Sequence, residues 1–189
     1  ILSCAATSSL CIGSGGSAGR EGPTVQIGSA VGSTIGQLLH LSSERVRVLV
    51  GCGAAAGIAA SFNAPLAGVL FALEVILGDF TIHTFSPIII ASVIGTVTGR
   101  LLEGNEITFQ VPVHELVSPT EIVFYLFLGF LCGFSARLFT GTYFFAHHFF
   151  DEKVNLPKWA KPALGGLVVG IASIFFPQIL GNGYEFMEQ

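Results

Sequence analysis

The residues best suited to chemistry lie in one glycine-rich run at residues 13–23, GSGGSAGREGP. The run holds one acid, Glu21, next to one base, Arg20, and long apolar segments flank it. Glycine permits backbone conformations that leave successive N–H groups unpaired, and Pro23 suits the first turn of a helix, where its missing donor costs nothing. A helix that starts at Pro23 points unpaired N–H groups and the positive end of its dipole toward Glu21, an arrangement that binds anions. We therefore predict that the Glu21 carboxylate occupies an anion site while ionised and leaves it when protonated or displaced.

The segments that must position this run have the composition of an all-α membrane protein. Of the 189 residues, 11% are charged and 51% are hydrophobic, and the mean hydropathy is +0.74. Soluble domains average about 25% charged residues. Four runs of roughly 20 residues hold no Asp, Glu, Lys or Arg and are long enough to cross or re-enter a bilayer: 22–43, 48–73, 80–99 and 162–184. We expect five or six membrane segments, and an acid such as Glu21 among them favours a functional site over a simple helix cap.

Two blocks of the chain resemble the CLC family of chloride channels and anion/proton exchangers. Residues 19–23 read GREGP, the family motif with Arg or Lys in second place, and residues 54–68 read AAAGIAASFNAPLAG. The resemblance, though patchier elsewhere, runs through the whole chain. It implies broken, tilted helices in two inverted repeats, with about 1–102 from the later part of the first repeat and about 119–189 from the start of the second. The chain is expected to be an excised part of one CLC membrane domain.

The resemblance also implies roles for individual residues. The matching glutamate, Glu21, would be the gate of a chloride pathway, and Arg20 would fix the loop by pairing with an acid. Backbone amides would coordinate the anion, and the predicted set is Gly19, Arg20, Glu21, Gly22, Thr24 and Val25. The family forms homodimers with one pathway per subunit, and the segments around 65–77 and 85–102 match those of the dimer contact. Chloride or a similar small anion is the expected ligand, with no cofactor.

One position separates channels from exchangers. Family exchangers carry a second glutamate for the internal proton route, and alignment through the FNAP sequence places this position on Val75, directly after Glu74. Valine cannot carry a proton, so this departure favours channel-like conduction. Proton-coupled chloride exchange stays open, because Glu74 or a water chain can substitute.

The remaining patterns predict the order of the elements. Gly28, Gly32 and Gly36, at intervals of four, predict a close helix-packing face. Asn63 and Pro65 predict a helix cap and restart inside the membrane, as in the broken helices of transporters. The expected helices are 1–12, 23–41, 44–61, 65–77, 85–102, 118–150 with a capping box at 118–121, and 162–176. An acidic loop at 103–118 and a basic loop at 151–161 would lie outside and inside the cell, respectively.

Other classes of protein find little support. The net charge of −4 argues against nucleic acid as a partner, and the four cysteines have no metal-like spacing, so no metal site is predicted. Residues 13–18 fit the dinucleotide fingerprint, but no strand-helix alternation accompanies them and no acid follows about 20 residues on, so an enzyme is not expected. His147 and His148 are expected to be interfacial residues. A non-conducting scaffold is the remote alternative, and general likeness suggests a bacterial inner membrane.

Overall fold

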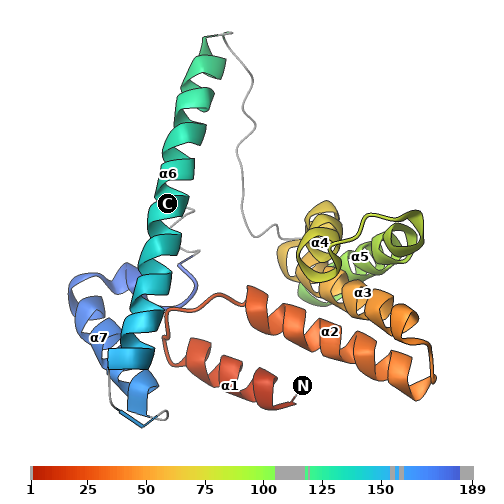
Figure 1. Ribbon diagram of the computed structural model, residues 1–189, viewed down its shortest axis with the longest axis horizontal. Helices are drawn as coiled ribbons and strands as arrows, with labels where there is room; N and C mark the ends of the chain where they lie inside the picture. Colours follow the sequence, from red (N-terminus) through yellow and green to blue (C-terminus); the bar gives the residue numbers. More distant parts are fainter. Residues whose placement is uncertain (1, 105–117, 119, 154–155, 158–159, 184–189) are drawn as a thin grey trace. The chain divides into compact units, whose positions relative to one another are not determined.

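The computed structural model describes residues 2–104, 118, 120–153, 156–157 and 160–183, and every regular element in these residues is a helix (Figure 1). This confirms the predicted all-α class. The chain forms two compact units, Ile1–Gln110 with Ala172–Gln189, and Val111–Ile171. The predicted inverted repeats stay a prediction, because compactness reports contacts and not symmetry. The expected acidic loop lies almost entirely outside the described residues.

The first unit holds the glycine-rich run and most of the helices. In chain order they are α1 (Leu2–Gly13), α2 (Glu21–Leu38), α3 (Ser43–Phe62), α4 (Pro65–Phe71), the π-helix η1 (Ala72–Leu77) and α5 (Ile82–Glu103), with the short 3₁₀ helix η3 (Pro177–Ile179). The predicted order is confirmed, but α2 begins at Glu21 instead of Pro23, and α5 begins at Ile82 instead of Phe85. Proline is compatible with any position in the first turn, so Pro23 does not mark the first residue.

Helix α3 lies at the centre of this unit, and glycine lets α2 approach it closely (Figure 1). A Cβ built on Gly28 would overlap the carbonyl group of Gly53, and one built on Gly32 would overlap that of Leu49. The predicted packing face is therefore confirmed. Its physical basis is contact between two backbones, which only a residue without a side chain permits.

Small residues also bring α4 and α5 against α3. A Cβ on Gly68 would lie 2.5 Å from the Ala55 carbonyl oxygen, and one on Gly95 would lie 2.7 Å from that of Ala56. The buried Ser92 hydroxyl of α5 donates to the Pro65 carbonyl over 2.6 Å. The core at this junction consists of Ala54, Ala55, Val69, Ala72, Leu73, Leu77 and Ile88. One closely packed group of helices, α2, α3, α4 and α5, therefore positions the candidate site residues of this unit.

The break between α3 and α4 differs from the prediction in one detail. Asn63 is not the N-cap of α4, because it has φ of 53° in the left-handed region and closes α3 instead. Ala64 occupies the cap position of α4, and Pro65 follows in its first turn. Asparagine is one of the few residues that adopt this conformation readily. The cap-plus-proline pattern therefore located the break and misassigned the asparagine.

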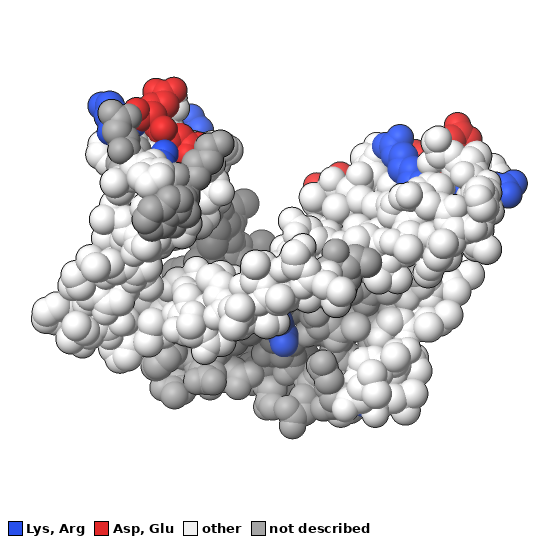
Figure 2. Space-filling view, turned by 90° about the horizontal axis from the view of Figure 1, so that it is seen from below, with Lys and Arg blue, Asp and Glu red and all other residues white. Residues whose placement is uncertain are grey.

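Within the described residues, three helices are long and apolar enough to cross a membrane: Ser43–Phe62, Ile82–Leu102 and Glu121–Lys153. Leu2–Gly13, Pro65–Leu77 and Ala160–Phe175 are apolar but shorter. On the face drawn in Figure 2, white atoms cover most of the described surface, and red and blue atoms are few and confined to small groups. The described part of the chain therefore has the broken membrane segments that were expected, although fewer of them reach full length.

The second unit is built on α6 (Glu121–His148), which continues as the π-helix η2 (Phe149–Lys153), and α7 (Ala160–Phe175) begins here. The predicted capping box is wrong, because α6 starts at Glu121 and Thr120 at its N-cap makes no side-chain cap hydrogen bond. The Ser118 hydroxyl lies 2.8 Å from the Thr120 hydroxyl instead. Pro119 lies outside the described residues. At about 1.5 Å per residue, the continuous helical stretch exceeds the hydrocarbon thickness and must tilt or protrude.

Candidate functional site

The first half of the glycine-rich run ends helix α1. The Gly16 amide donates to the Cys11 carbonyl over 2.9 Å, and the Gly15 amide donates to the Ile12 carbonyl over 3.0 Å. Gly15 has φ of +89°. This is the Schellman pattern of helix termination, which needs a left-handed residue and therefore favours glycine. These two amides satisfy helix carbonyls, so anion binding must depend on the second half of the run.

Hydrogen bonds also attach the run to residues far along the chain. The Ser17 hydroxyl donates to the Ile179 carbonyl, and the Gly181 amide donates to the Gly15 carbonyl over 3.4 Å. Both contacts lie within the first unit. These two hydrogen bonds therefore attach the loop at residues 15–17 to the segment at residues 179–181.

The Glu21 carboxylate folds back over Gly19. A Cβ built on Gly19 would overlap the Oε2 atom of Glu21. Glu21 is the first residue of α2, so its side chain lies at the positive end of the helix dipole, where an ionised carboxylate is favoured. A side chain at position 19 would therefore have to displace the Glu21 carboxylate, which is the flexible end of its side chain.

Arg20 anchors the motif to the end of α3. Its Nη2 atom donates to the Ser61 carbonyl over 2.8 Å, and its guanidinium lies 5.4 Å from the centre of the Phe62 ring. A cation at a helix C-terminus complements the negative end of the dipole. These contacts suit the loop-fixing role expected of Arg20. No sequence pattern pointed to Ser61 and Phe62 as its partners, because they lie some 40 residues away.

The predicted anion-binding amides lie together around the start of α2. Gly19 and Arg20 precede the helix, and Glu21, Gly22, Thr24 and Val25 occupy its first turn and a half. The Thr24 amide donates to the Arg20 carbonyl over 3.1 Å, and the Thr24 hydroxyl donates to the same oxygen over 2.7 Å. In this conformation the Thr24 amide makes the first helical hydrogen bond, so its predicted role requires that it share or exchange that bond.

A groove of about 290 Å³ runs along the flank of the motif, between α1 and α2. Ser8 and Ser9 of α1 line it, together with Arg20 and Thr24. Hydroxyl groups and a guanidinium are groups that solvate anions well. The motif therefore borders a space with a partly polar wall.

Glu74 and Val75, the predicted proton-route positions, lie on the π-helix η1. Both side chains are exposed, whereas Leu73 and Leu77 of the same helix are buried. A π-helix is rare and often marks a functional segment. Nothing in the sequence predicted it.

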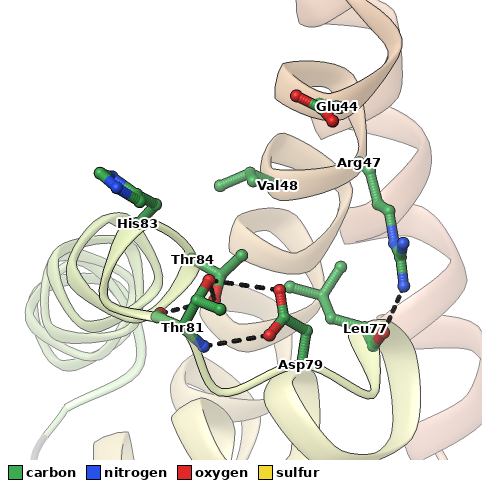
Figure 3. A pocket seen from close by; sticks show the side chains of 8 residues that line it. All are labelled: Glu44, Arg47, Val48, Leu77, Asp79, Thr81, His83 and Thr84. Atoms are coloured by element: carbon green, nitrogen blue, oxygen red, sulfur yellow. Dashed lines mark hydrogen bonds between the residues drawn. The ribbon is translucent and has the colours of Figure 1, made fainter.

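The end of η1 borders a cavity of about 270 Å³ (Figure 3). Arg47 of α3 donates to the Leu77 carbonyl, which lies at the C-terminal end of η1. Asp79 accepts a hydrogen bond from the Thr81 amide over 3.1 Å, just before α5 begins. The polar groups in this cavity therefore hold the ends of two helices.

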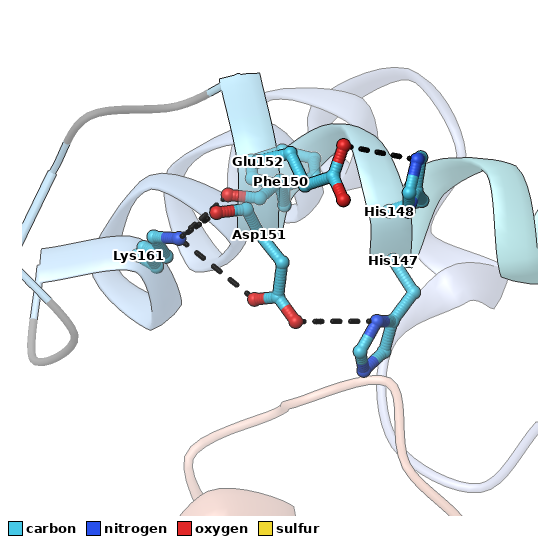
Figure 4. A network of polar contacts seen from close by, with 6 residues as sticks. All are labelled: His147, His148, Phe150, Asp151, Glu152 and Lys161. Atoms are coloured by element: carbon cyan, nitrogen blue, oxygen red, sulfur yellow. Dashed lines mark hydrogen bonds and ion pairs between the residues drawn. The ribbon is translucent and has the colours of Figure 1, made fainter.

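A second polar cluster lies in the other unit (Figure 4). His147 Nδ1 lies 3.4 Å from Asp151 Oδ2, and His148 Nε2 lies 3.0 Å from Glu152 Oε2. Lys161 donates from Nζ to the Phe150 carbonyl over 2.6 Å, which satisfies a carbonyl in the π-helix η2 that continues α6. Among the residues that the structure describes, no group of three His, Cys, Asp or Glu side chains could hold a metal ion. We assign this cluster to helix termination.

Comparison with known proteins decides the family. The model of the family described as voltage gated chloride channel matches residues 1–189. The chain belongs to the CLC family. It is accordingly a multi-pass membrane protein of a family of chloride channels and transporters and not an enzyme, and its bacterial origin stays a prediction.

Individual CLC proteins match nearly the whole chain. A putative chloride channel protein, ClcB-like, of Ralstonia nicotianae is 40% identical over 183 residues, which are 94% of this chain and 42% of the relative. Chloride channel protein CLC-f of Arabidopsis thaliana is 37% identical and is covered to 24%. The crystal structure of a slow cyanobacterial Cl⁻/H⁺ antiporter matches with a TM-score of 0.80 at 30% identity, over 93% of this chain and 42% of that one. The chain therefore spans less than half the length of these CLC relatives.

Proposed function

We propose that this chain forms part of a chloride pathway across a membrane and that Glu21 is the gate of this pathway. The observation that carries the proposal is the Glu21 carboxylate, folded over Gly19 at the N-terminus of α2. While ionised, it takes the place that an anion would take at the helix terminus. Protonation or displacement vacates this place, and the surrounding amides then receive the anion.

The contacts of Arg20 support this assignment. A gate that moves needs a fixed frame, and Arg20 holds the motif to α3 through the Ser61 carbonyl and the Phe62 ring. The acid can therefore swing while the backbone donors stay in place. The groove beside α1 provides a partly polar space next to the motif.

Channel-like conduction is the favoured mode of transport. Val75 stands where family exchangers carry the inner proton-transferring glutamate, and a valine side chain binds no proton. Proton-coupled exchange is the second candidate. The likeness to a Cl⁻/H⁺ antiporter favours it, as does Glu74, an exposed acid one residue away.

The test is a simultaneous measurement of chloride and proton flux from liposomes that contain the full-length protein under a chloride gradient. Chloride efflux without proton movement is the expected result for a channel. Efflux that drives protons uphill would establish exchange, and Glu74→Gln should then abolish the coupling.

Glu21→Gln tests the gate in the same assay, because glutamine resembles the protonated acid. We expect the variant to conduct anions without gating. Its flux should rise about tenfold or more, because an open state populated to about 10% or less can increase by at least that factor. Glu44→Gln is the matched control, because Glu44 is an exposed acid in the first turn of α3. An unchanged flux in Glu21→Gln would refute the gate and favour a scaffold.

A further inference from the structure

Two arginines from distant parts of the chain contact the turn that closes α3. From one side, Arg20 donates to the Ser61 carbonyl over 2.8 Å. From the other side, Arg100 in the last turn of α5 donates from Nε to the Oδ1 atom of Asn63 over 2.6 Å. Two guanidinium groups thus contact residues 61 and 63, and that of Arg20 also lies over the ring of Phe62.

The backbone of this turn makes the two contacts depend on each other. Asn63 has φ of 53°, and its amide donates to the Ala59 carbonyl. The Ala64 amide donates to the same oxygen over 3.2 Å. These backbone hydrogen bonds constrain the position of the Asn63 backbone relative to the Ser61 carbonyl. A shift of Asn63 therefore carries the Ser61 carbonyl with it.

We infer that Arg100 is a positioning residue for the gate, acting through Asn63 and the end of α3 on Arg20. The inference rests on the proposed gating role of Glu21. Arg20 directly precedes Glu21, so the place of the Ser61 carbonyl decides how firmly the carboxylate is held over Gly19. Arg100 has no place in the anion site itself.

Removal of the Arg100 contact loosens the turn and lets Arg20 move. The carboxylate then lies over Gly19 for a smaller share of the time, and the basal anion flux rises. Coupling through packed contacts of this kind changes an equilibrium by about two- to thirtyfold, and a single hydrogen bond at the end of a helix belongs in the lower part of that span, about two- to tenfold. We expect a flux increase in this range, smaller than the increase caused by Glu21→Gln.

The experiment uses the full-length protein in liposomes, with chloride as the transported ion. Arg100→Gln removes the guanidinium, and Asn63→Gly removes the acceptor while it keeps a residue that tolerates the left-handed conformation. Both variants should raise the flux alike, and the double variant should raise it no further. Arg100→Lys, which keeps a charged donor, should restore part of the closure. Thr98→Ala is the control, because the Thr98 hydroxyl donates within α5, to the Ile94 carbonyl.

The decisive comparison repeats these variants in the Glu21→Gln protein. If Arg100 acts through the gate, neither Arg100→Gln nor Asn63→Gly changes the flux in this background. Equal flux changes in both backgrounds, or no change in either, would overturn the inference while the gate stands. If Glu21→Gln itself has no effect, the proposed function fails first, and the positioning role fails with it.

Discussion

Gly19 is the residue on which the geometry of the gate most directly depends. Its ordinary backbone conformation would admit other residues, since its φ is not among the positive values. The restriction comes from the Oε2 atom of Glu21, which occupies the space of a Cβ. Gly15 differs, because its φ of +89° by itself favours glycine. The two glycines of the run therefore differ: backbone conformation favours glycine at position 15, whereas a side chain at position 19 would displace the carboxylate.

Gly19→Ala should displace the Glu21 carboxylate, because the added methyl group takes the carboxylate's place. We expect chloride efflux from liposomes to approach that of Glu21→Gln, about tenfold above the unmodified protein, on the same population argument. Gly13→Ala is the matched control, since a Cβ at Gly13 meets nothing within 4 Å.

The double variant Gly19→Ala/Glu21→Gln distinguishes the gate from a general loss of packing. Its efflux should equal that of Glu21→Gln alone. A further change in the double variant would mean that the methyl group acts on something other than the carboxylate.

Helices α2 and α3 are joined by backbone contact where Gly28 meets Gly53. Neither carbonyl group can move aside without a shift of its whole helix. The proposed gate, Glu21, is the first residue of α2, so this contact also sets the position of the motif against the end of α3. The close approach of the two backbones therefore fixes α2 against α3.

Gly28→Ala should force α2 and α3 apart and lower the free energy of unfolding by about 1–3 kcal/mol, the usual cost of overpacking. Thermal unfolding of the full-length protein in detergent measures the loss. Gly129→Ala on α6 serves as the control, because a Cβ there meets no described atom within 4 Å. An equal loss in both variants would contradict the role assigned to the Gly28 contact.

The whole protein is proposed to be a homodimer, as the family resemblance implies. Along α5, Ile90, Val93, Ile94, Val97 and Leu101 have exposed side chains in the described structure. Helix surfaces in a membrane associate through close packing. In a two-fold symmetric dimer, a substitution in this surface changes the contact at two places, once from each subunit.

Ile94→Trp should weaken the dimer, since two indoles would have to fit where two isoleucines pack. We expect the dissociation constant of the dimer of the full-length protein in detergent to rise about tenfold, for an overpacking cost near 1.4 kcal/mol, so that the monomer fraction rises about threefold. Light scattering after size-exclusion chromatography measures it. Ile122→Trp on α6 is the matched control, because Ile122 is 59% exposed and Ile94 is 60% exposed. Dissociation of both variants to the same degree would place the dimer contact elsewhere.

Local chemistry in the sequence determined much of this protein. Charge-free runs predicted membrane helices, the glycine-rich run predicted a break before α2, and proline with asparagine predicted the break before α4. The GREGP and FNAPLAG blocks indicated the family. These features depend on residues close together in the chain, so they can be recognised without knowledge of the tertiary structure.

Contacts between distant residues were decided only by the tertiary structure. Arg20 meets Ser61, Arg100 meets Asn63, and Gly28 meets Gly53, each pair 25 or more residues apart. The π-helical turn that carries Glu74 and Val75 depends likewise on packing, since Leu73 and Leu77 are buried against α3 and α5. A local sequence pattern limits the conformations that a segment can adopt. Contacts with residues elsewhere in the chain then determine which of these conformations is stable.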